Sequence, residues 1–231
     1  MIGIIGAMEV EIQGLRAMLK EPQCTTLSGM EFVTGILEET PVVLAVCGVG
    51  KVFAALCAQT MILRFGAEKV INTGVAGTLC RELGIGDVAI SKDVVQHDMD
   101  ISGLGEPYGF LNGPDLIHVP ADPELVRLVE QVVREQGHTC QTGTIATGDQ
   151  FLCDGARKSW IHDTFGALAG EMEGGSIGTV CYANNVPFVI IRVMSDDADG
   201  NAPENFPAFA AQAAETSIQI TAEVVRRLAH G

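Results

Sequence analysis

Short runs of β-branched residues alternate with stretches of helical periodicity along the whole chain, and this alternation strongly restricts the possible folds. Residues 70–74 and 186–194, for example, have the length and composition of buried strands. Buried strands between amphipathic helices predict a mostly parallel sheet covered by helices on both faces. No repeat or linker divides the sequence, so we expect a single α/β domain over residues 1–231.

The predicted elements indicate where a site should lie. The expected strands are residues 1–6, 32–37, 41–46, 70–74, 88–95, 144–147, 167–170 and 186–194, and the expected helices are residues 8–19, 51–65, 123–136, 176–184 and 207–228. In sheets of this kind, ligands bind beyond the carboxyl ends of the strands. Functional residues are therefore expected among the polar side chains that directly follow each apolar run.

The composition excludes several classes of function. The formal charge is −15, from 29 acidic and 14 basic residues, and such a field repels nucleic acid and anionic membrane surfaces. No apolar run approaches the roughly 20 residues that cross a bilayer, and the first residues lack the basic region of a secretory signal. The seven cysteines occur singly, which favours reduced thiols. We expect a cytoplasmic protein that binds neither nucleic acid nor membrane.

Motifs that would point to a cofactor are incomplete. Gly74 and Gly77 follow a predicted strand without forming the dinucleotide fingerprint, and residues 48–51 fail the phosphate-loop pattern at both ends. The two glycines indicate either a close backbone approach to a ligand or a tight strand–helix turn. The segment HDMD at 97–100 resembles half of a metal site, but no second group of ligands has supporting spacing. We expect no metal and no cofactor.

Glu11 lies within the apolar arc of the predicted helix 8–19. At about 100° per residue, Met8, Ile12 and Leu15 form one stripe, and Glu11 falls inside it. A carboxylate that points into an apolar interior is costly unless it has a partner or a task. Glu11 is therefore either a site residue or an edge residue whose carboxylate reaches solvent.

Two acidic residues follow the predicted strand 167–170. Glu171 and Glu173 flank Met172, just before a predicted helix. A carboxylate can accept hydrogen bonds from both hydroxyls of a ribose, and a thioether offers an apolar surface beside a ring. The alternative interpretation is a helix amino terminus whose acidic residues complement the helix dipole.

The strand 186–194 contains an arginine near its end and leads into an acidic segment. A buried Arg192 requires a carboxylate or ligand partner. Ser195, Asp196, Asp197 and Asp199 follow it. These residues are either part of a site or a solvated, calcium-like loop.

These segments occur together, in order, in one family. The chain resembles the bacterial 5′-methylthioadenosine/S-adenosylhomocysteine nucleosidases in IGIIGAMEVE at 2–11, CGVGK at 47–51, INTGVAG at 71–77, GDVAIS at 86–91, HDMD at 97–100, TGDQF at 147–151, EMEG at 171–174, VPFVIIRVMSD at 186–196 and NFPAF at 205–209. The resemblance covers essentially the full chain. It implies a nucleoside phosphorylase-like fold, which is an α/β/α sandwich with a mostly parallel mixed sheet. It also implies a homodimer that hydrolyses the N-glycosidic bond of 5′-substituted adenosines without a cofactor.

The resemblance also implies roles for individual residues. Asp196 would protonate N7 of the purine, Glu11 would hold and deprotonate the attacking water with help from Arg192, and Glu173 would bind the ribose hydroxyls. The implied substrate-binding residues are Met172 against the sugar, Phe151 stacked on adenine, the backbone of Leu152 at the base edge, Ala76, Gly77 and Ser195 around the ribose and base, and Met8, Val49 and Phe206 around the 5′-thio group.

The chain departs from the family pattern at two places. Val75 stands where family members commonly have Ser, and GLGEPYGF at 103–110 stands where many read AFGYxYGQ. In the family this loop reaches into the 5′ pocket of the neighbouring subunit, so residues 101–110 are expected at a dimer interface. The preferred 5′ substituent is the property that these departures affect most.

Three alternatives remain beside the nucleosidase interpretation. A phosphorylase of the same fold would need a basic residue for phosphate, for which Lys51 and Arg81 are the candidates. An aminofutalosine nucleosidase would use the same machinery on a different 5′ group. A non-catalytic nucleoside-binding protein would be expected to lack the acid or the water-binding carboxylate, yet Asp196 and Glu11 are both present.

Overall fold

The structure is a computed structural model that describes residues 1–196 and 206–230. Its strands are β1 (Ile2–Gly6), β2 (Lys20–Leu27), β3 (Met30–Leu37), β4 (Thr40–Val46), β5 (Lys69–Thr78), β6 (Val88–Gln96), β7 (Val119–Pro120), β8 (Cys140–Thr147), β9 (Ala167–Glu171) and β10 (Phe188–Met194). Its helices are α1 (Glu9–Ala17), α2 (Lys51–Phe65), η1 (Ser102–Leu104), α3 (Pro123–Glu135), α4 (Gly155–Phe165), α5 (Gly174–Ala183) and α6 (Phe206–His230).

The strands form one mixed sheet in the order β10-β6-β8-β9-β5-β1-β4-β3-β2. Parallel pairs join β1 to β4 and β5, and β8 to β6 and β9, whereas β2, β3 and β4 pair antiparallel. A further parallel pairing joins β10 back to β5, so strands β5, β9, β8, β6 and β10 close into a ring. The expected mixed sheet is confirmed, and its partial closure is a feature that local sequence patterns did not predict.

The closure depends on the pairing of β5, because different parts of this strand pair with different neighbours. Residues Lys69 to Asn72 pair with β1, whereas Gly77 and Thr78 pair with β9. Strand β1 ends at Gly6, so the middle of β5 beyond Asn72 has no strand on the β1 side. Backbone amides at this opening are therefore available to side chains or to a ligand.

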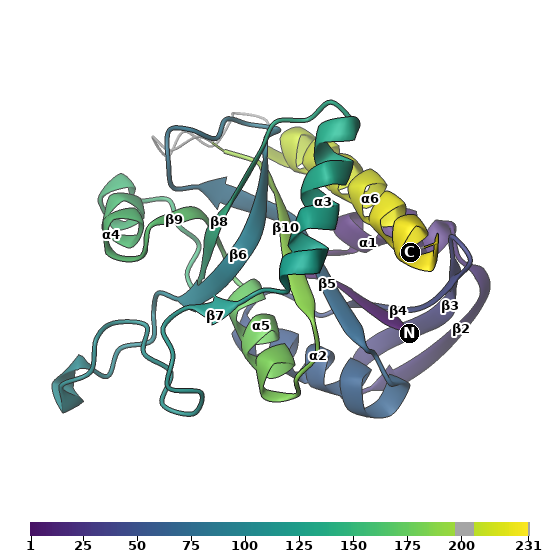
Figure 1. Ribbon diagram of the computed structural model, residues 1–231, viewed down its shortest axis with the longest axis horizontal. Helices are drawn as coiled ribbons and strands as arrows, with labels where there is room; N and C mark the ends of the chain where they lie inside the picture. Colours follow the sequence, from purple (N-terminus) through teal and green to yellow (C-terminus); the bar gives the residue numbers. More distant parts are fainter. Residues whose placement is uncertain (197–205, 231) are drawn as a thin grey trace.

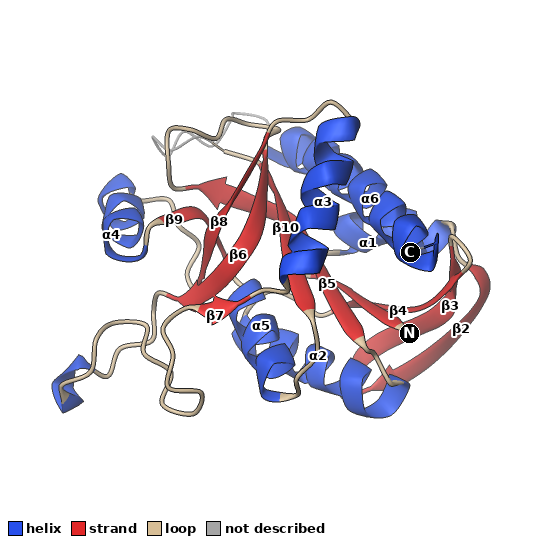
Figure 2. Cartoon of the chain, viewed as in Figure 1, coloured by secondary structure: helices blue, strands red, loops and turns tan. Residues whose placement is uncertain are grey.

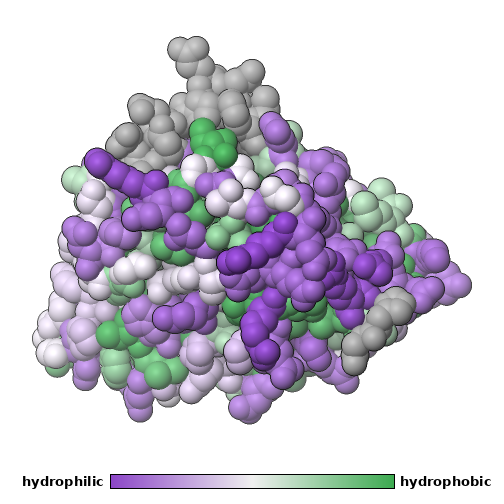
Figure 3. All heavy atoms as spheres, turned by 45° about the horizontal axis from the view of Figure 1, so that its top comes forward, coloured by the Kyte–Doolittle hydropathy of each residue, from purple (hydrophilic) through white to green (hydrophobic). Residues whose placement is uncertain are grey.

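Helices cover both faces of the sheet, as the sandwich prediction requires (Figures 1 and 2). Helix α6 contacts both α1 and α3 along one face, and α2 and α5 pack together on the other. Helix α4 lies apart from both groups, against β8 and β9. The surface in Figure 3 is mostly hydrophilic, with apolar side chains in separate patches.

Several local predictions are confirmed. The helix expected at 51–65 is α2, and the expected strand pair is the hairpin of β3 and β4, whose turn has Glu38 and Glu39 at positive φ. Helix α3 begins at an N-cap, because Asp122 accepts hydrogen bonds from the amides of Glu124 and Leu125. No described helix is both long enough and apolar enough to span a membrane.

Four described elements were not predicted: β2, α4 and the two short elements β7 and η1. Strand β2 reads KEPQCTTL and is largely exposed at the edge of the sheet, so it lacks the apolar alternation that identifies a half-buried strand. Helix α4 buries Lys158, Ile161 and Phe165 on one face, and the lysine interrupts its apolar stripe. The predicted strand 70–74 was too short, because β5 continues to Thr78.

Candidate active site

A cavity of about 180 Å³ lies beyond the carboxyl ends of β1, β9 and β10, beside the final residues of β5. Its described lining consists of Ala7, Met8, Glu11, Val49, Val75, Ala76, Gly77, Gln150, Phe151, Leu152, Gly170, Glu171, Met172, Glu173, Ser195 and Asp196. The tertiary structure thus gathers nearly all the residues that the sequence singled out. Arg192 lies behind the cavity, and the side chain of Phe206, like the loop 198–205, falls outside the described part.

Glu11 is buried at the opening beside β5. Its Oε2 accepts hydrogen bonds from the amides of Ala7 at 2.8 Å and Met8 at 2.9 Å, and its Oε1 accepts one from the amide of Val75 at 3.0 Å. No described strand pairs with this part of β5 on the side of β1. The Glu11 carboxylate instead accepts the hydrogen bond of the Val75 amide. Only 3% of the residue is exposed, so the alternative of a solvent-reaching edge residue is wrong.

Asp196 occupies a second fixed position in the cavity. Its Oδ1 accepts a hydrogen bond from the amide of Thr78 at 2.8 Å, and its Oδ2 accepts one from Nζ of Lys158 at 2.9 Å. Sequence inspection missed Lys158. The available signal was a lysine on the apolar face of a helix, but α4 itself was not predicted. Asp196 is buried and not part of a solvated loop, whereas Asp197 and Asp199 lie outside the described residues.

The two glycines of β5 provide room for these carboxylates. Gly74 and Gly77 lie within the strand, so the interpretation as a strand–helix turn is wrong. A Cβ at Gly74 would collide with the carboxylate of Glu11, and a Cβ at Gly77 would lie 3.1 Å from both oxygens of Asp196. Side chains at these positions would push the carboxylates out of place.

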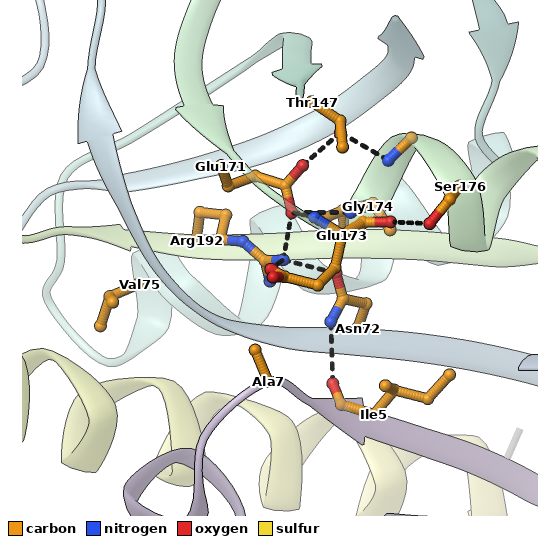
Figure 4. Close-up of polar contacts among 12 residues, drawn as sticks. Ile5, Ala7, Asn72, Val75, Thr147, Glu171, Glu173, Gly174, Ser176 and Arg192 are labelled. Atoms are coloured by element: carbon orange, nitrogen blue, oxygen red, sulfur yellow. Dashed lines mark hydrogen bonds and ion pairs between the residues drawn. The ribbon is translucent and has the colours of Figure 1, made fainter. Parts of the chain in front are cut away.

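Glu171 and Glu173 separate into two roles. Oε2 of Glu171 accepts hydrogen bonds from the amides of Glu173 and Gly174 at the start of α5, and it also pairs with Arg192 (Figure 4). The other carboxylate oxygen of Glu171, Oε1, accepts a hydrogen bond from the hydroxyl of Thr147. The helix-terminus interpretation therefore describes Glu171, and only Glu173 remains available for a sugar.

Arg192 contacts three polar side chains beside the cavity, those of Glu171, Glu173 and Asn72. Its Nη2 pairs with Glu171, lies 3.7 Å from Oε2 of Glu173, and donates to Oδ1 of Asn72 at 2.6 Å. Asn72 in turn donates to the carbonyl of Ile5 at 2.9 Å, which links β5 to β1 (Figure 4). The resemblance assigns Arg192 to the arrangement around Glu11, but its ion pairs are formed with Glu171 and Glu173.

Glu173 is held from outside its own helix. Its Oε1 accepts a hydrogen bond from the amide of Gly50 at 2.9 Å, just before α2. Burial raises the pKa of the Glu173 carboxyl from its ordinary value of 4.5 to about 7, and the charge of Glu171 adds to this rise, while Arg192 and the Gly50 amide oppose it. A group with such a pKa changes its charge near neutrality.

This raised pKa predicts a pH-dependent stability. The folded state holds the Glu173 proton more tightly than the unfolded state, so its contribution to stability is lost as pH rises from 4.5 through 7. In Glu173→Gln this loss is absent. We therefore compare the difference in unfolding free energy, variant minus wild type, at two pH values. This difference should be about 3 kcal/mol larger at pH 8.5 than at pH 4.5. Urea unfolding at both pH values measures this, and an unchanged difference would contradict the assigned pKa.

The rest of the lining suits an apolar ring and substituent. Met8, Val49 and Val75 contribute apolar side chains, and Phe151 is 68% exposed at the mouth, where a flat base can lie against it. Leu152 and Met172 also line the cavity. The described lining therefore combines the carboxylates of Glu11, Glu173 and Asp196, and that of Glu171 paired with Arg192, with apolar walls.

The described lining contains neither Lys nor Arg. Lys51, a candidate for phosphate, pairs through Nζ with Oδ1 of Asp98 at 2.7 Å, and Arg81 is exposed. Nothing in the described cavity thus offers a positive charge to phosphate, which favours water as the nucleophile. Asp98 belongs to the segment that resembles half of a metal site, and its carboxylate forms an ion pair with Lys51. The described residues contain no group of three or more metal-ligating side chains.

Comparisons with known proteins agree with this fold and site. Residues 1–226 match the family model described as the phosphorylase superfamily. A 5′-methylthioadenosine/S-adenosylhomocysteine nucleosidase of Staphylococcus aureus (strain JH9) is 40% identical over 99% of this chain and 100% of the relative.

Solved structures are similar over nearly the whole chain. A mutant nucleosidase of Helicobacter pylori with 5′-methylthioadenosine in the active site has a TM-score of 0.93 at 35% identity, covering 98% of both chains. A futalosine hydrolase of Helicobacter pylori strain 26695 has a TM-score of 0.92 at 36% identity, covering 98% of this chain and 97% of the other. The chain belongs to the phosphorylase superfamily and, within it, to the family of 5′-methylthioadenosine/S-adenosylhomocysteine nucleosidases.

Proposed function

We propose that this chain hydrolyses the N-glycosidic bond of 5′-methylthioadenosine, S-adenosylhomocysteine and related 5′-substituted adenosines, releasing adenine and the 5′-thioribose. The observation that carries the proposal is the pair of buried carboxylates, Glu11 and Asp196, each held by backbone amides in one cavity with Glu173. The identity to curated nucleosidases over the full chain supports the substrate class.

The chemistry follows from the leaving group. Breaking the bond between C1′ and N9 moves its electron pair onto the purine, and protonation of N7 by Asp196 neutralises that charge. The sugar then carries oxocarbenium character, which nearby carboxylates stabilise. Water attacks C1′, and Glu11 accepts its proton. Glu173 holds the ribose by accepting hydrogen bonds from its hydroxyls.

The direct test measures adenine release from 5′-methylthioadenosine by the purified protein, with and without phosphate. We expect adenine and free methylthioribose in phosphate-free buffer, because the described cavity lining has no basic side chain for phosphate. Release that depends on phosphate would instead identify a phosphorylase of this fold. Binding without release under both conditions would favour a nucleoside-binding protein.

A second substrate follows from the futalosine hydrolase among the similar structures. The same carboxylates would cleave aminofutalosine, because the reaction centre is shared and only the 5′ group differs. The apolar lining around Met8, Val49 and Val75 favours a thioether over a polar substituent. Comparing kcat/KM for the two nucleosides decides between them, and a higher value for aminofutalosine would overturn this preference.

We further propose a homodimer with the loop 101–110 at its interface. Exposed apolar side chains gather on α2, at Val52, Phe53 and Leu56, and Leu104 and Tyr108 are exposed on the loop. Large exposed apolar side chains of this kind are typical of interfaces. Val49 is 59% exposed and also lines the cavity, so the apolar surface is continuous with the site.

The dimer makes a testable prediction. We expect wild-type protein to sediment as a dimer and Phe53→Asp to shift it towards monomer, because a buried charge at the interface has no partner there. Adenine release should fall in parallel, since the cavity adjoins the interface. A strictly monomeric wild type with full activity would contradict both the interface and its link to the site.

We also propose that this reaction belongs to methionine salvage and nucleoside catabolism in the cytoplasm. The cysteines support a reducing compartment, since all seven are free and Cys47, Cys57, Cys80 and Cys181 are buried. Fractionation of cells that carry the tagged protein tests the location, and recovery in a membrane or secreted fraction would contradict it.

A further inference from the structure

Lys158 is an unusual residue for the buried face of a helix. It lies on α4 in line with Ile161 and Phe165, and only 1% of its surface is exposed. Lysine is almost never fully buried unless its charge is paired, because removing an ammonium from water is costly. Helix α4 packs on β8 and β9, and from this position the lysine reaches the carboxylate of Asp196.

The ammonium of Lys158 is directed at the candidate general acid. Its Nζ donates to Oδ2 of Asp196 at 2.9 Å, while the amide of Thr78 donates to Oδ1 at 2.8 Å. Gly77 lies flat against the same carboxylate, because a Cβ there would come within 3.1 Å of both oxygens. Asp196 is thereby held through each of its oxygens, with the glycine against it, and it still lines the cavity.

We propose that Lys158 is the positioning residue for Asp196, a role that rests on the proposed function. The ammonium and the Thr78 amide are donors only, so each occupies one lone-pair position on its oxygen. One of the two remaining positions can carry the transferable proton and donate it to N7 of the base. Lys158 therefore fixes which edge of the carboxyl group faces the substrate without touching the substrate itself.

Position matters here because a general acid must lie within hydrogen-bond reach of the atom it protonates. A misplacement of about 1 Å can cost about a hundredfold in rate. Without Lys158, the carboxyl group keeps the Thr78 hydrogen bond and can rotate about it. The loss should therefore appear in protonation of the leaving group and spare the steps that do not use Asp196.

The test compares two leaving groups in Lys158→Met. One substrate is 5′-methylthioadenosine, whose adenine requires a proton, and the other is 4-nitrophenyl 5-methylthioribofuranoside, whose nitrophenolate leaves without one. We expect kcat for the nucleoside to fall about a hundredfold with little change in KM, while nitrophenol release changes little. Asp196→Asn should show the same selective pattern.

Further variants separate positioning from folding. Lys158→Arg keeps a charged donor and should restore part of the lost kcat, and Lys158→Gln provides a neutral donor if the methionine variant does not fold. Lys92→Met is the matched control, because it removes a lysine charge whose side chain is 72% exposed; it should retain wild-type rates on both substrates.

Two outcomes would overturn the role of Lys158. One is an equal loss on both substrates, which indicates structural damage only, and the other is an unchanged kcat for the nucleoside. Wild-type protein that releases no adenine would instead overturn the proposed function, and this role with it.

Discussion

Asp196→Asn is expected to lower adenine release from 5′-methylthioadenosine by about 10²–10⁴-fold while the protein still binds the nucleoside. An amide cannot supply the proton that N7 requires, whereas the cavity walls that contact base and sugar are unchanged. Single-turnover assays give the rate, and calorimetry with the intact nucleoside gives the affinity.

The same substitution breaks the ion pair between Asp196 and Lys158, so thermal unfolding should be measured alongside activity. A variant that folds, binds and releases adenine at the wild-type rate would eliminate Asp196 as the general acid. A variant that neither binds nor folds would leave Lys158→Arg as the informative change, because it retains the acid.

Glu11→Gln is expected to reduce turnover on the same scale, about 10²–10⁴-fold, because a neutral amide cannot accept the proton of the attacking water. It should also destabilise the fold. Three backbone amides, from Ala7, Met8 and Val75, donate to the two carboxylate oxygens. The amide nitrogen of glutamine would face at least one of these donors, which costs about 1–3 kcal/mol.

The matched control for Glu11→Gln is Glu9→Gln. Glu9 lies two residues earlier on α1 and is exposed, so the control removes one charge from the same helix without reaching the cavity. It should keep the wild-type rate and stability. If Glu11→Gln still released adenine at the wild-type rate, Glu11 would have no role in activating water.

Much of the fold could be predicted from local pattern because each core element carries its own signal. The apolar run at β10 and the Ala-rich sequence of α2 each indicate their secondary structure from neighbouring residues alone. Strand β2 could not be predicted this way, since an exposed edge strand has no apolar face to mark it. Closure of the sheet through β5 and β10 is a long-range pairing that no local window contains.

In the candidate site, too, some features could be predicted from local sequence and others depend on long-range contacts. Glu11 and Asp196 stood out because a carboxylate inside an apolar arc, or after a buried strand, requires an explanation. Glu171 and Glu173 are chemically equivalent in the sequence, and only their neighbours distinguish them. Glu171 is used by Arg192 and the start of α5, which leaves Glu173 for the ligand.

By itself, the sequence determined the alternation of strands and helices and the chemical groups available at the strand ends, because both depend on residues close together in the chain. Only the tertiary structure decided which groups meet. Lys158 and Asp196 are 38 positions apart, and Glu11 and Val75 are 64 apart, yet each pair is joined by a hydrogen bond. Such contacts depend on how the sheet closes and how the helices pack on it, and packing is a property of the whole chain.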